Sequence, residues 1–230
     1  MYILIANKVP LGRHVASALV SRGHEVAYVD ESLEYCNLVS TELGCLTIEG
    51  EPTNLRVLQS ADIERADAVI ALLDEDIENI LVGLFARQFG VPRIVAVLTH
   101  EHYRAAYELA GIENVRSSFD FLFNEVLIAV ENPIIRRVMA VGDGRIEIAA
   151  IDVIADSPLI GQGVEAIFRH PDFPRAAMVL GLLHAGDRTV SVPRDAPVLR
   201  GDDEVLVVGT HQEVQAVAAL MGHRRRGFLS

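Results

Sequence analysis

The sequence predicts an α/β fold in its first half, a parallel sheet with helices on both faces, followed by a small α+β domain. Short apolar segments alternate with segments of helical periodicity as far as residue 117. The apolar segments lie a dozen or more residues apart, which leaves room for a crossover helix between parallel strands. Beyond residue 142, short β-type segments lie between loops that are rich in glycine and proline. These three observations carry the fold prediction.

The elements of the first half follow from this alternation. Strands are predicted over residues 2–6, 25–29, 45–48, 68–73, 94–98 and 114–116. The helices between them are predicted from Pro10 to residue 22, over 33–42, in a short segment after residue 53, over 76–89 and over 101–110. Proline suits the first turn of a helix because its missing N–H costs nothing there. Four of these helices are expected to end at Gly23, Gly44, Gly90 and Gly111.

The second half begins with a segment, 119–140, that is predicted to be mainly helical and to break near Asn132-Pro133. The turn cluster 142–144 is the best boundary. Further segments follow at 146–154, 164–168, 176–183, 189–192 and 204–208, with a helix over 212–221. We therefore expect a first domain over 1–118, a helical crossover or hinge over 119–141, a second domain over 142–222 and a basic tail over 223–230.

Composition restricts the class of function. Of the 230 residues, 50% are hydrophobic and 23% are charged, as expected for a globular chain. The net charge of −12 argues against a groove for nucleic acid. No apolar run approaches the roughly 18–20 residues that span a bilayer, and residues 1–5 do not resemble a signal peptide. We expect a cytoplasmic protein without membrane insertion. The basic cluster 224–226 is expected to be a solvated tail, with contact to anionic lipid as the alternative.

The first strand–turn–helix is the place where a Rossmann-like domain holds a pyrophosphate. The usual GxGxxG pattern supplies a tight turn, close backbone approach and the N–H groups of a helix N-terminus. Its three glycine positions hold Asn7, Val9 and Gly12 here. Asn7 can still make the turn, whereas Val9 projects a branched side chain toward the phosphates. Lys8 could supply a positive charge instead. A loop that has lost tight nucleotide binding is the alternative interpretation.

Asp30 gives the opposite signal. It stands at the end of the second predicted strand, where an acidic residue accepts hydrogen bonds from both ribose hydroxyls. An acidic side chain there disfavours a 2′-phosphate, so NAD(H), ATP, ADP or AMP would be preferred over NADP. An ordinary solvated turn residue is the alternative.

No catalytic constellation is recognisable. The eight histidines are scattered, and none is paired by a motif with a serine or cysteine nucleophile. Lys8 is the only lysine, so a tyrosine–lysine pair at YxxxK spacing is absent from the sequence. The acidic cluster 74–78 is expected to interact with the positive end of the following helix, with Asp74 or Glu75 near its cap. A divalent-cation site there is the alternative. These features predict a protein that is not an enzyme.

Together these features resemble the RCK/KTN family of TrkA- and KtrA-like subunits, which regulate potassium transporters and channels. In the first half the resemblance rests on Asp30, Asn79 and the motifs Gly12-Arg13, Gly23-His24-Glu25-Val26, Gly50-Glu51-Pro52-Thr53, Gly90-Val91-Pro92 and Leu109-Ala110-Gly111-Ile112. In the second half it rests on Ser157-Pro158-Leu159-Ile160-Gly161, Val192-Pro193 and the run from Leu199 to Gly209, which resemble a TrkA-C domain.

The resemblance implies a Rossmann-like TrkA-N domain and a TrkA-C-type regulatory domain. It implies a homodimer, usually assembled into a ring on the cytoplasmic side of a membrane potassium transporter or channel. An adenine nucleotide would bias the shape of that ring. The implied nucleotide-binding residues add Glu51 and Thr53 to those named above. The segment 119–140 would serve as hinge and dimer crossover.

The sequence departs from the family pattern at several positions. Asn7 and Val9 replace glycines, which puts the affinity for nucleotide in question. Ser117-Ser118-Phe119 lacks the glutamate that some KtrA-like members use for a divalent cation, so no metal site is predicted. Arg169 stands near an arginine that binds cyclic di-AMP in some members, which makes it a possible ligand residue of the second domain.

Two other functions remain open at this stage. One is a structural interaction subunit that has lost its nucleotide. The other is an NAD-dependent oxidoreductase, which would need an acid–base residue facing the cofactor.

Overall fold

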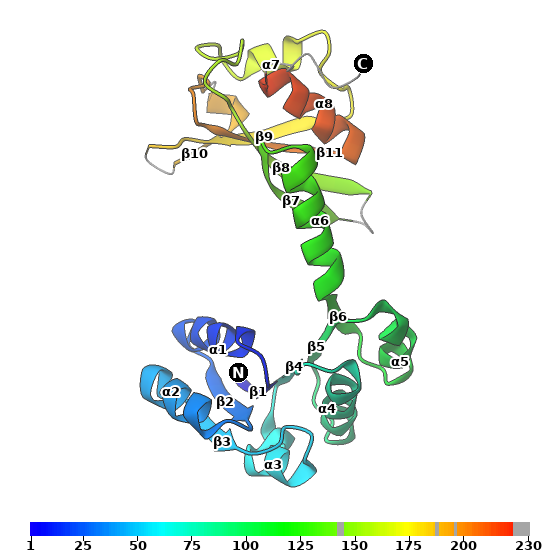
Figure 1. Cartoon of the computed structure of the whole chain (residues 1–230). Coiled ribbons are helices and arrows are strands. Elements are labelled where there is room, and N and C mark those ends of the chain that lie inside the picture. Colours follow the sequence, from blue (N-terminus) through cyan, green and yellow to red (C-terminus); the bar gives the residue numbers. More distant parts are fainter. Residues whose placement is uncertain (142–144, 187–188, 196, 223–230) are drawn as a thin grey trace. The chain divides into compact units, whose positions relative to one another are not determined.

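The computed structural model describes residues 1–141, 145–186, 189–195 and 197–222. The chain divides into two compact units, Met1–Phe121 and Leu122–Ser230, and Figure 1 shows the elements of each. The predicted tail 223–230 and the boundary cluster 142–144 lie outside the described residues. Among the described residues, no helix is both long and apolar enough to cross a bilayer.

The first unit is a six-stranded parallel sheet with the strand order β3-β2-β1-β4-β5-β6. Its strands are β1 (Tyr2–Asn7), β2 (Glu25–Asp30), β3 (Leu46–Glu49), β4 (Ala68–Leu72), β5 (Ile94–Leu98) and β6 (Asn114–Ser117). The helices are α1 (Leu11–Ser21), α2 (Leu33–Leu43), α3 (Leu55–Ser60), α4 (Asp76–Gln88) and α5 (Arg104–Leu109), with 3₁₀ turns η1 (Ile63–Arg65) and η2 (Glu101–Tyr103). The predicted α/β class is confirmed.

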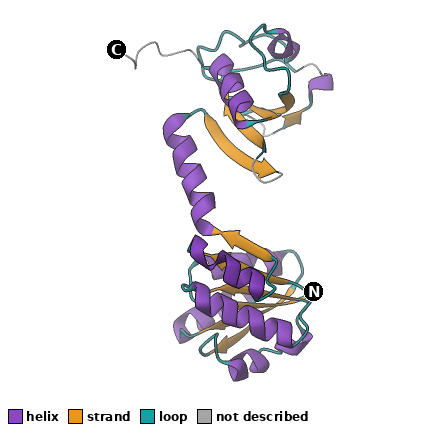
Figure 2. Ribbon diagram, turned by 90° about the vertical axis from the view of Figure 1, so that its right-hand side faces the viewer, coloured by secondary structure: helices purple, strands orange, loops and turns teal. Residues whose placement is uncertain are grey.

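The central strand β1 explains why this sheet has helices on both faces. All six of its residues are buried. Tyr2, Leu4 and Ala6 pack into the core that holds α4 and α5, whereas Ile3 and Ile5 pack into a separate core with α1 and α2. The strand period of two therefore divides one apolar run between two cores. In Figure 1, α1 and α2 lie on one side of this sheet and α4 lies on the other, and Figure 2 shows helices in front of the strands.

The strand order places a topological switch beside β1. This strand pairs with β2 on one side and with β4 on the other, because the crossover after β3 carries the chain back across the sheet. In open α/β sheets, ligands bind at such a point, outside the carboxyl ends of the strands. The predicted crevice residues lie at this edge.

The second unit is a five-stranded antiparallel sheet with the order β10-β9-β11-β8-β7. Its strands are β7 (Ile135–Val141), β8 (Ile146–Asp152), β9 (Met178–Leu183), β10 (Val190–Ser191) and β11 (Glu204–Gly209). They are accompanied by α7 (Glu165–Arg169), the 3₁₀ turn η3 (Pro193–Asp195) and α8 (His211–Met221). Residues of β8, β9 and β11 share a buried core with Val214 and Val217 of α8.

The predicted helix over 119–140 is wrong in its second half. Helix α6 (Ser118–Glu131) ends before Pro133, and the chain continues as β7, which pairs with β8. A proline disfavours helical backbone in the residue before it and cannot donate a backbone hydrogen bond, so the helix stops there. The β-branched Ile134 and Ile135 then favour an extended backbone, and Ile135 is buried in the core of the second unit.

Candidate ligand-binding crevice

The crevice lies at the carboxyl ends of β1 and β2, where the sheet register sets Asn7 directly beside Asp30. The backbone N–H of the next residue, Lys8, donates to the carbonyl oxygen of Leu72 at the end of β4 over 3.0 Å. The turn after β1 is therefore held between β2 and β4. These contacts bring residues from three strand ends into one site.

Asp30 is buried, with 3% of its surface exposed. Its Oδ1 accepts a hydrogen bond from the backbone N–H of Ser32 over 2.9 Å. Its Oδ2 accepts from Asn7 Nδ2 over 2.8 Å and from the Tyr28 hydroxyl over 3.2 Å. Burial, with the nearby Asp30 carboxylate, raises the pKa of Tyr28, so the phenol keeps the proton that it donates. The predicted ribose acceptor is present, but three donors of the protein already bind it.

Asn7 fills the space where a glycine would leave room. It is 2% exposed, and its Nδ2 also donates to the Tyr28 hydroxyl over 2.7 Å. Its Oδ1 is the one buried side-chain oxygen or nitrogen in the described part of the chain for which no hydrogen-bond partner is found. A Cβ atom on Gly12 would lie 2.0 Å from this Oδ1. Gly12 therefore makes room for the Asn7 side chain.

Lys8 joins three carboxylates. Its Nζ lies 2.9 Å from Glu78 Oε1, 3.0 Å from Glu51 Oε1 and 3.6 Å from Glu31 Oε2. Only 13% of the lysine side chain is exposed. Burial alone would lower its pKa, but hydrogen bonds to Glu78 and Glu51 outweigh it and raise the pKa of Lys8. The ammonium group therefore stays charged at neutral pH.

Glu51 is held from a second side as well. The backbone N–H and hydroxyl of Thr53 both donate to its Oε1, over 3.3 Å and 3.0 Å. Burial works in the opposite direction, yet the contacts with Lys8 and Thr53 lower the pKa of Glu51. Glu51 is thus an ionised carboxylate that fixes the position of the lysine.

The cavity that remains in the crevice is small for a nucleotide. A cavity of 170 Å³ opens between Lys8, Pro10, Glu31 and Tyr35, whereas pockets for small ligands typically hold about 300–1,000 Å³. The N-cap residue of helix α1 is Pro10, which has no N–H to offer a phosphate. The carboxylate that is predicted to bind a ribose is present, but the turn where a phosphate would lie has one N–H fewer.

The structure brings most of the predicted site residues together. Asn7, Lys8, Val9 and Asp30 line the same cavity. Gly12 lies against Asn7, while Glu51 joins the site through Lys8 and Thr53 through Glu51. The nucleotide-binding role of these residues remains a prediction.

Arg169 belongs to the second unit. Its side chain is 81% exposed and pairs with Glu165 over 2.8 Å, one turn earlier in α7. It lines an open cavity of 520 Å³ together with Gln162 and His170. Its role as a ligand residue also remains a prediction.

Sequence reasoning did not assign three residues to the crevice: Tyr28 and Glu31 were not singled out, and Glu78 was considered only as part of the acidic cluster 74–78. Each is contributed by a different part of the fold, since Tyr28 lies within β2, Glu31 follows it and Glu78 belongs to α4. The available signal was the single lysine, whose buried charge requires carboxylate partners. The sequence did not identify those partners.

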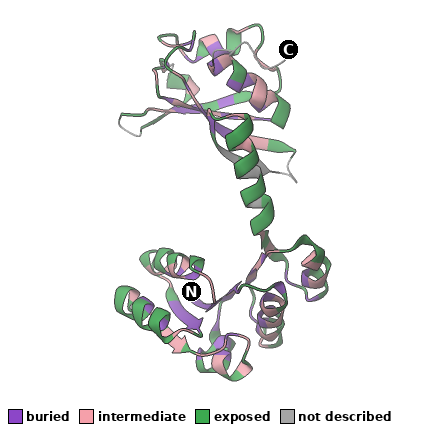
Figure 3. Cartoon of the chain, in the orientation of Figure 1, coloured by how far each residue is buried: buried purple, intermediate pink, exposed green. Residues whose placement is uncertain are grey.

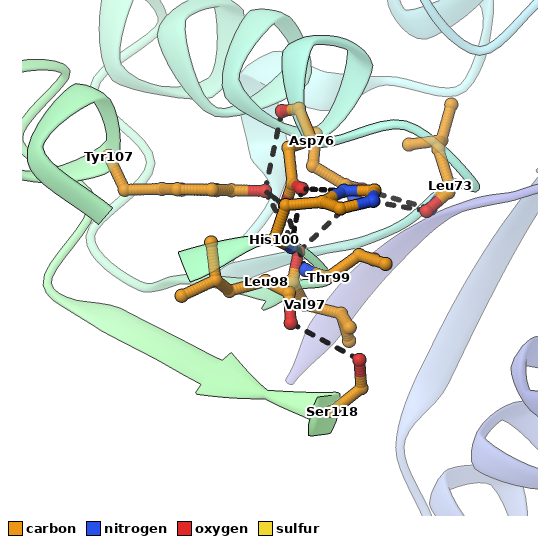
Figure 4. A network of polar contacts seen from close by, with 9 residues as sticks. Leu73, Asp76, Val97, Leu98, Thr99, His100, Tyr107 and Ser118 are labelled. Carbon is orange, nitrogen blue, oxygen red and sulfur yellow. Dashed lines mark hydrogen bonds and ion pairs between the residues drawn. The ribbon is translucent and has the colours of Figure 1, made fainter. Parts of the chain in front are cut away.

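A second polar network lies at the same edge of the sheet, in the first turn of α4 (Figure 4). The buried Asp76 accepts hydrogen bonds from the backbone N–H groups of Thr99 and His100 and from the Tyr107 hydroxyl. His100 Nδ1 lies 3.0 Å from Asp76 Oδ2. Burial alone would raise the pKa of Asp76, but these hydrogen bonds have the larger effect, and the pKa of Asp76 is lowered. Asp76 therefore fixes the loop after β5.

Comparison with known proteins gives the family. The TrkA-N domain matches residues 5–118. The Trk system potassium uptake protein TrkA homolog of Methanothermobacter thermautotrophicus is 24% identical over 96% of this chain and 100% of its own length. The corresponding homolog of Pyrococcus abyssi is 26% identical over 98% of this chain and 99% of its own.

Solved structures agree in fold. The GsuK RCK domain has a TM-score of 0.67 and 23% identity, and the match covers 96% of this chain but only 47% of that one. GsuK bound to ADP has a TM-score of 0.50 and 26% identity, over 56% of this chain and 34% of that one. The chain thus spans less than half of GsuK. Its TrkA-N domain, its relatives along the full length and its RCK fold together show that the chain belongs to the RCK/KTN family.

Proposed function

We propose that the chain is a cytosolic regulatory subunit of a membrane potassium-uptake transporter or channel, and that it works by binding, not by catalysis. The observation that carries this proposal is the similarity along the whole chain to Trk system potassium uptake proteins, which covers 96–98% of the residues. Both units take part in that similarity. A regulatory role through oligomer shape needs both.

The signal in this proposal is an adenine nucleotide, NAD(H), ATP, ADP or AMP, with Asp30 as the ribose-binding residue. The position of Asp30 at the end of β2 supports it. GsuK, which is 26% identical over 56% of this chain, has been solved bound to ADP. The ligand must bind one conformation of the subunit better than another, since equal affinity shifts no equilibrium.

The subunit acts as a homodimer or a larger ring in this proposal, and α6 provides the pairing surface. Its exposed apolar side chains follow one helical stripe: Phe119, Leu122, Phe123, Val126, Leu127 and Val130. An exposed stripe of this size in a soluble protein is typical of a protein–protein contact. Figure 3 shows how much of α6 is exposed.

The first test is isothermal titration with NADH, NAD, ATP, ADP and AMP. Asp30→Asn removes a charged acceptor, so we expect binding to weaken by about 1.5–3 kcal/mol, the range for hydrogen bonds to charged groups. Glu34→Gln is the matched control because it removes one negative charge from the exposed surface of α2. Equal affinity in both variants would remove Asp30 from the site.

The second test concerns the membrane partner. We expect cells that lack their own regulatory subunit to regain rapid potassium uptake when they express this chain beside its cognate membrane protein. The two proteins should also copurify. Normal uptake without this chain would contradict the regulatory role.

An oxidoreductase is the alternative that the Asp76–His100 pair keeps testable. A histidine oriented by a buried carboxylate is a usual general acid–base group, and His100 is half exposed at the same sheet edge. Turnover of NADH with small carbonyl substrates that is lost in His100→Asn would replace the regulatory proposal. We expect no turnover.

A further inference from the structure

The crevice is closed by side chains of this chain, and one cation connects them. Lys8 follows β1, Glu31 follows β2 and Glu51 follows β3, whereas Glu78 belongs to α4, the helix after β4. The lysine therefore links the carboxyl ends of four parallel strands, which is the region where a nucleotide lies in this type of fold.

The carboxylate of Asp30 is also occupied by groups of the protein itself. A carboxylate has about four acceptor positions, two on each oxygen. Oδ2 already accepts two hydrogen bonds, from Asn7 and from Tyr28, and Oδ1 accepts one from Ser32. A ribose that uses both of its hydroxyls must displace at least one of these donors. Asn7 is the donor that stands at the end of β1, next to the turn that holds a pyrophosphate in a Rossmann domain.

The two polar atoms of the Asn7 amide differ in their hydrogen bonding, and this difference favours a side chain that can leave its position. Its Nδ2 makes two short hydrogen bonds, while its buried Oδ1 has no partner within the described residues. Turning the amide over would bring Oδ1 against the Asp30 carboxylate, which is repulsive. In the observed orientation the closed position thus leaves the Oδ1 acceptor unsatisfied, and a rotation of the side chain out of the crevice would expose that acceptor to water.

We propose that Asn7 and Lys8 form an internal latch that occupies the crevice in the absence of ligand. Opening requires Asn7 to leave Asp30, and Lys8 to leave Glu51 and Glu78. This inference rests on the proposed nucleotide-binding function and adds its regulation. Because Lys8 links four strand ends, its release would change how these strand ends are held together at the ligand-binding edge of the first unit. The closed and open states of the first unit would therefore differ in shape as well as in affinity for a ribose-bearing anion.

The first experiment needs no ligand and uses the fact that Lys8 is the only lysine. Selective ¹⁵N labelling of lysine gives one side-chain NH₃⁺ signal in the NMR spectrum of the full chain. We expect it to exchange slowly with water and to differ from the signal of the urea-unfolded protein. Glu78→Gln should shift it, whereas Glu34→Gln should not. A rapidly exchanging, unfolded-like signal in the wild type would overturn the latch.

The second experiment measures ADP affinity by calorimetry in the wild type, Asn7→Ala and Glu78→Gln. Asn7→Ala keeps a Cβ and removes the amide, so we expect ADP to bind about tenfold more tightly, the value of roughly one hydrogen bond. Glu78→Gln should also tighten binding because it loosens Lys8. If Asn7→Ala failed to fold, Glu78→Gln would still test the latch.

The outcomes separate this inference from the proposed function. Binding by Asn7→Ala but not by the wild type would support the latch and contradict nucleotide sensing by the native chain. Equal binding by the wild type and both variants would contradict the latch and leave nucleotide sensing intact. No binding by any of the three would contradict both.

Discussion

Gly12 occupies the third glycine position of a phosphate-binding loop, but its neighbour gives it another role. A Cβ atom there would lie 2.4 Å from Asn7 Cγ as well as 2.0 Å from Oδ1. The glycine is therefore required by the asparagine that replaced the first glycine. The Asn7 side chain lies against Gly12, in the space that a glycine at position 7 would leave empty. The loop therefore keeps the tight turn of a phosphate-binding loop, but the Asn7 side chain lies against its glycine.

Asp76 shows a similar dependence on neighbours. It lies in the first turn of α4, where an acidic residue is favourable next to the positive helix end. The sequence predicted Asp74 or Glu75 near the cap of this helix. The structure selects Asp76, because only its carboxylate receives the two backbone N–H groups after β5. Glu75 is the N-cap residue but makes no capping hydrogen bond through its side chain.

We predict that Asp76→Asn destabilises the first unit by about 1–3 kcal/mol at pH 7, because hydrogen bonds to a buried charge are lost. The folded protein lowers the pKa of Asp76 below its unfolded value of about 3.9. Its stabilisation is therefore complete above that value and is lost as the pH falls through the lower folded pKa. Urea unfolding at pH 7 and pH 3 measures both effects. The difference between wild type and variant should shrink at pH 3, while the exposed control Asp74→Asn should have little effect at either pH.

Helix α6, which begins in the first unit and continues into the second, carries apolar side chains that remain exposed. A helix normally covers its apolar stripe with a core. Here Ile128 packs against the core of the second unit, whereas Val126 and Val130 are 56% and 78% exposed. A second copy of the chain would cover such a stripe in the proposed dimer.

We predict that Val126→Glu weakens self-association of the protein, because it would bury an unpaired charge in an apolar contact. Light scattering at several concentrations measures the change, and the expected result is a shift toward monomer. Leu33→Glu is a matched control, since Leu33 is 54% exposed on a different helix, α2. Equal effects of both substitutions would mean that α6 has no special role in assembly.

At the scale of the molecule, the two units can be followed separately because of where the aromatic residues lie. The chain has no tryptophan, and all five tyrosines belong to the first unit. Tyrosine fluorescence therefore reports on the parallel-sheet unit alone, while circular dichroism reports on both. Stabilisation of either unit by a bound ligand can therefore be measured in the full chain.

We predict that ADP stabilises the unit that tyrosine fluorescence reports. At a concentration of 100 times Kd the gain should be about 2.7 kcal/mol, because ligand binds only the folded state. Urea unfolding with and without ADP measures it, and at the same ADP concentration Asp30→Asn should reduce the gain to about 1.3 kcal/mol or less. An ADP effect confined to the circular dichroism signal would instead assign the nucleotide to the second unit.

The sequence alone determined the alternation of strands and helices, the parallel sheet and the place of Asp30 at a strand end. These features depend on local periodicity, on turn residues and on the length of the connections between strands. The helix predicted over 119–140 failed at Pro133 because periodicity alone does not separate an apolar helix from a strand that pairs with a distant one.

Tertiary structure alone decided the contents of the crevice. Glu78 is 70 residues from Lys8 along the chain, and Asp30 is 23 residues from Asn7. No local pattern links such pairs, because they meet only when parallel strands align their carboxyl ends at one edge of the sheet. The sequence therefore indicated where a ligand site would be, and the packed strand ends decided that the site is filled by its own side chains.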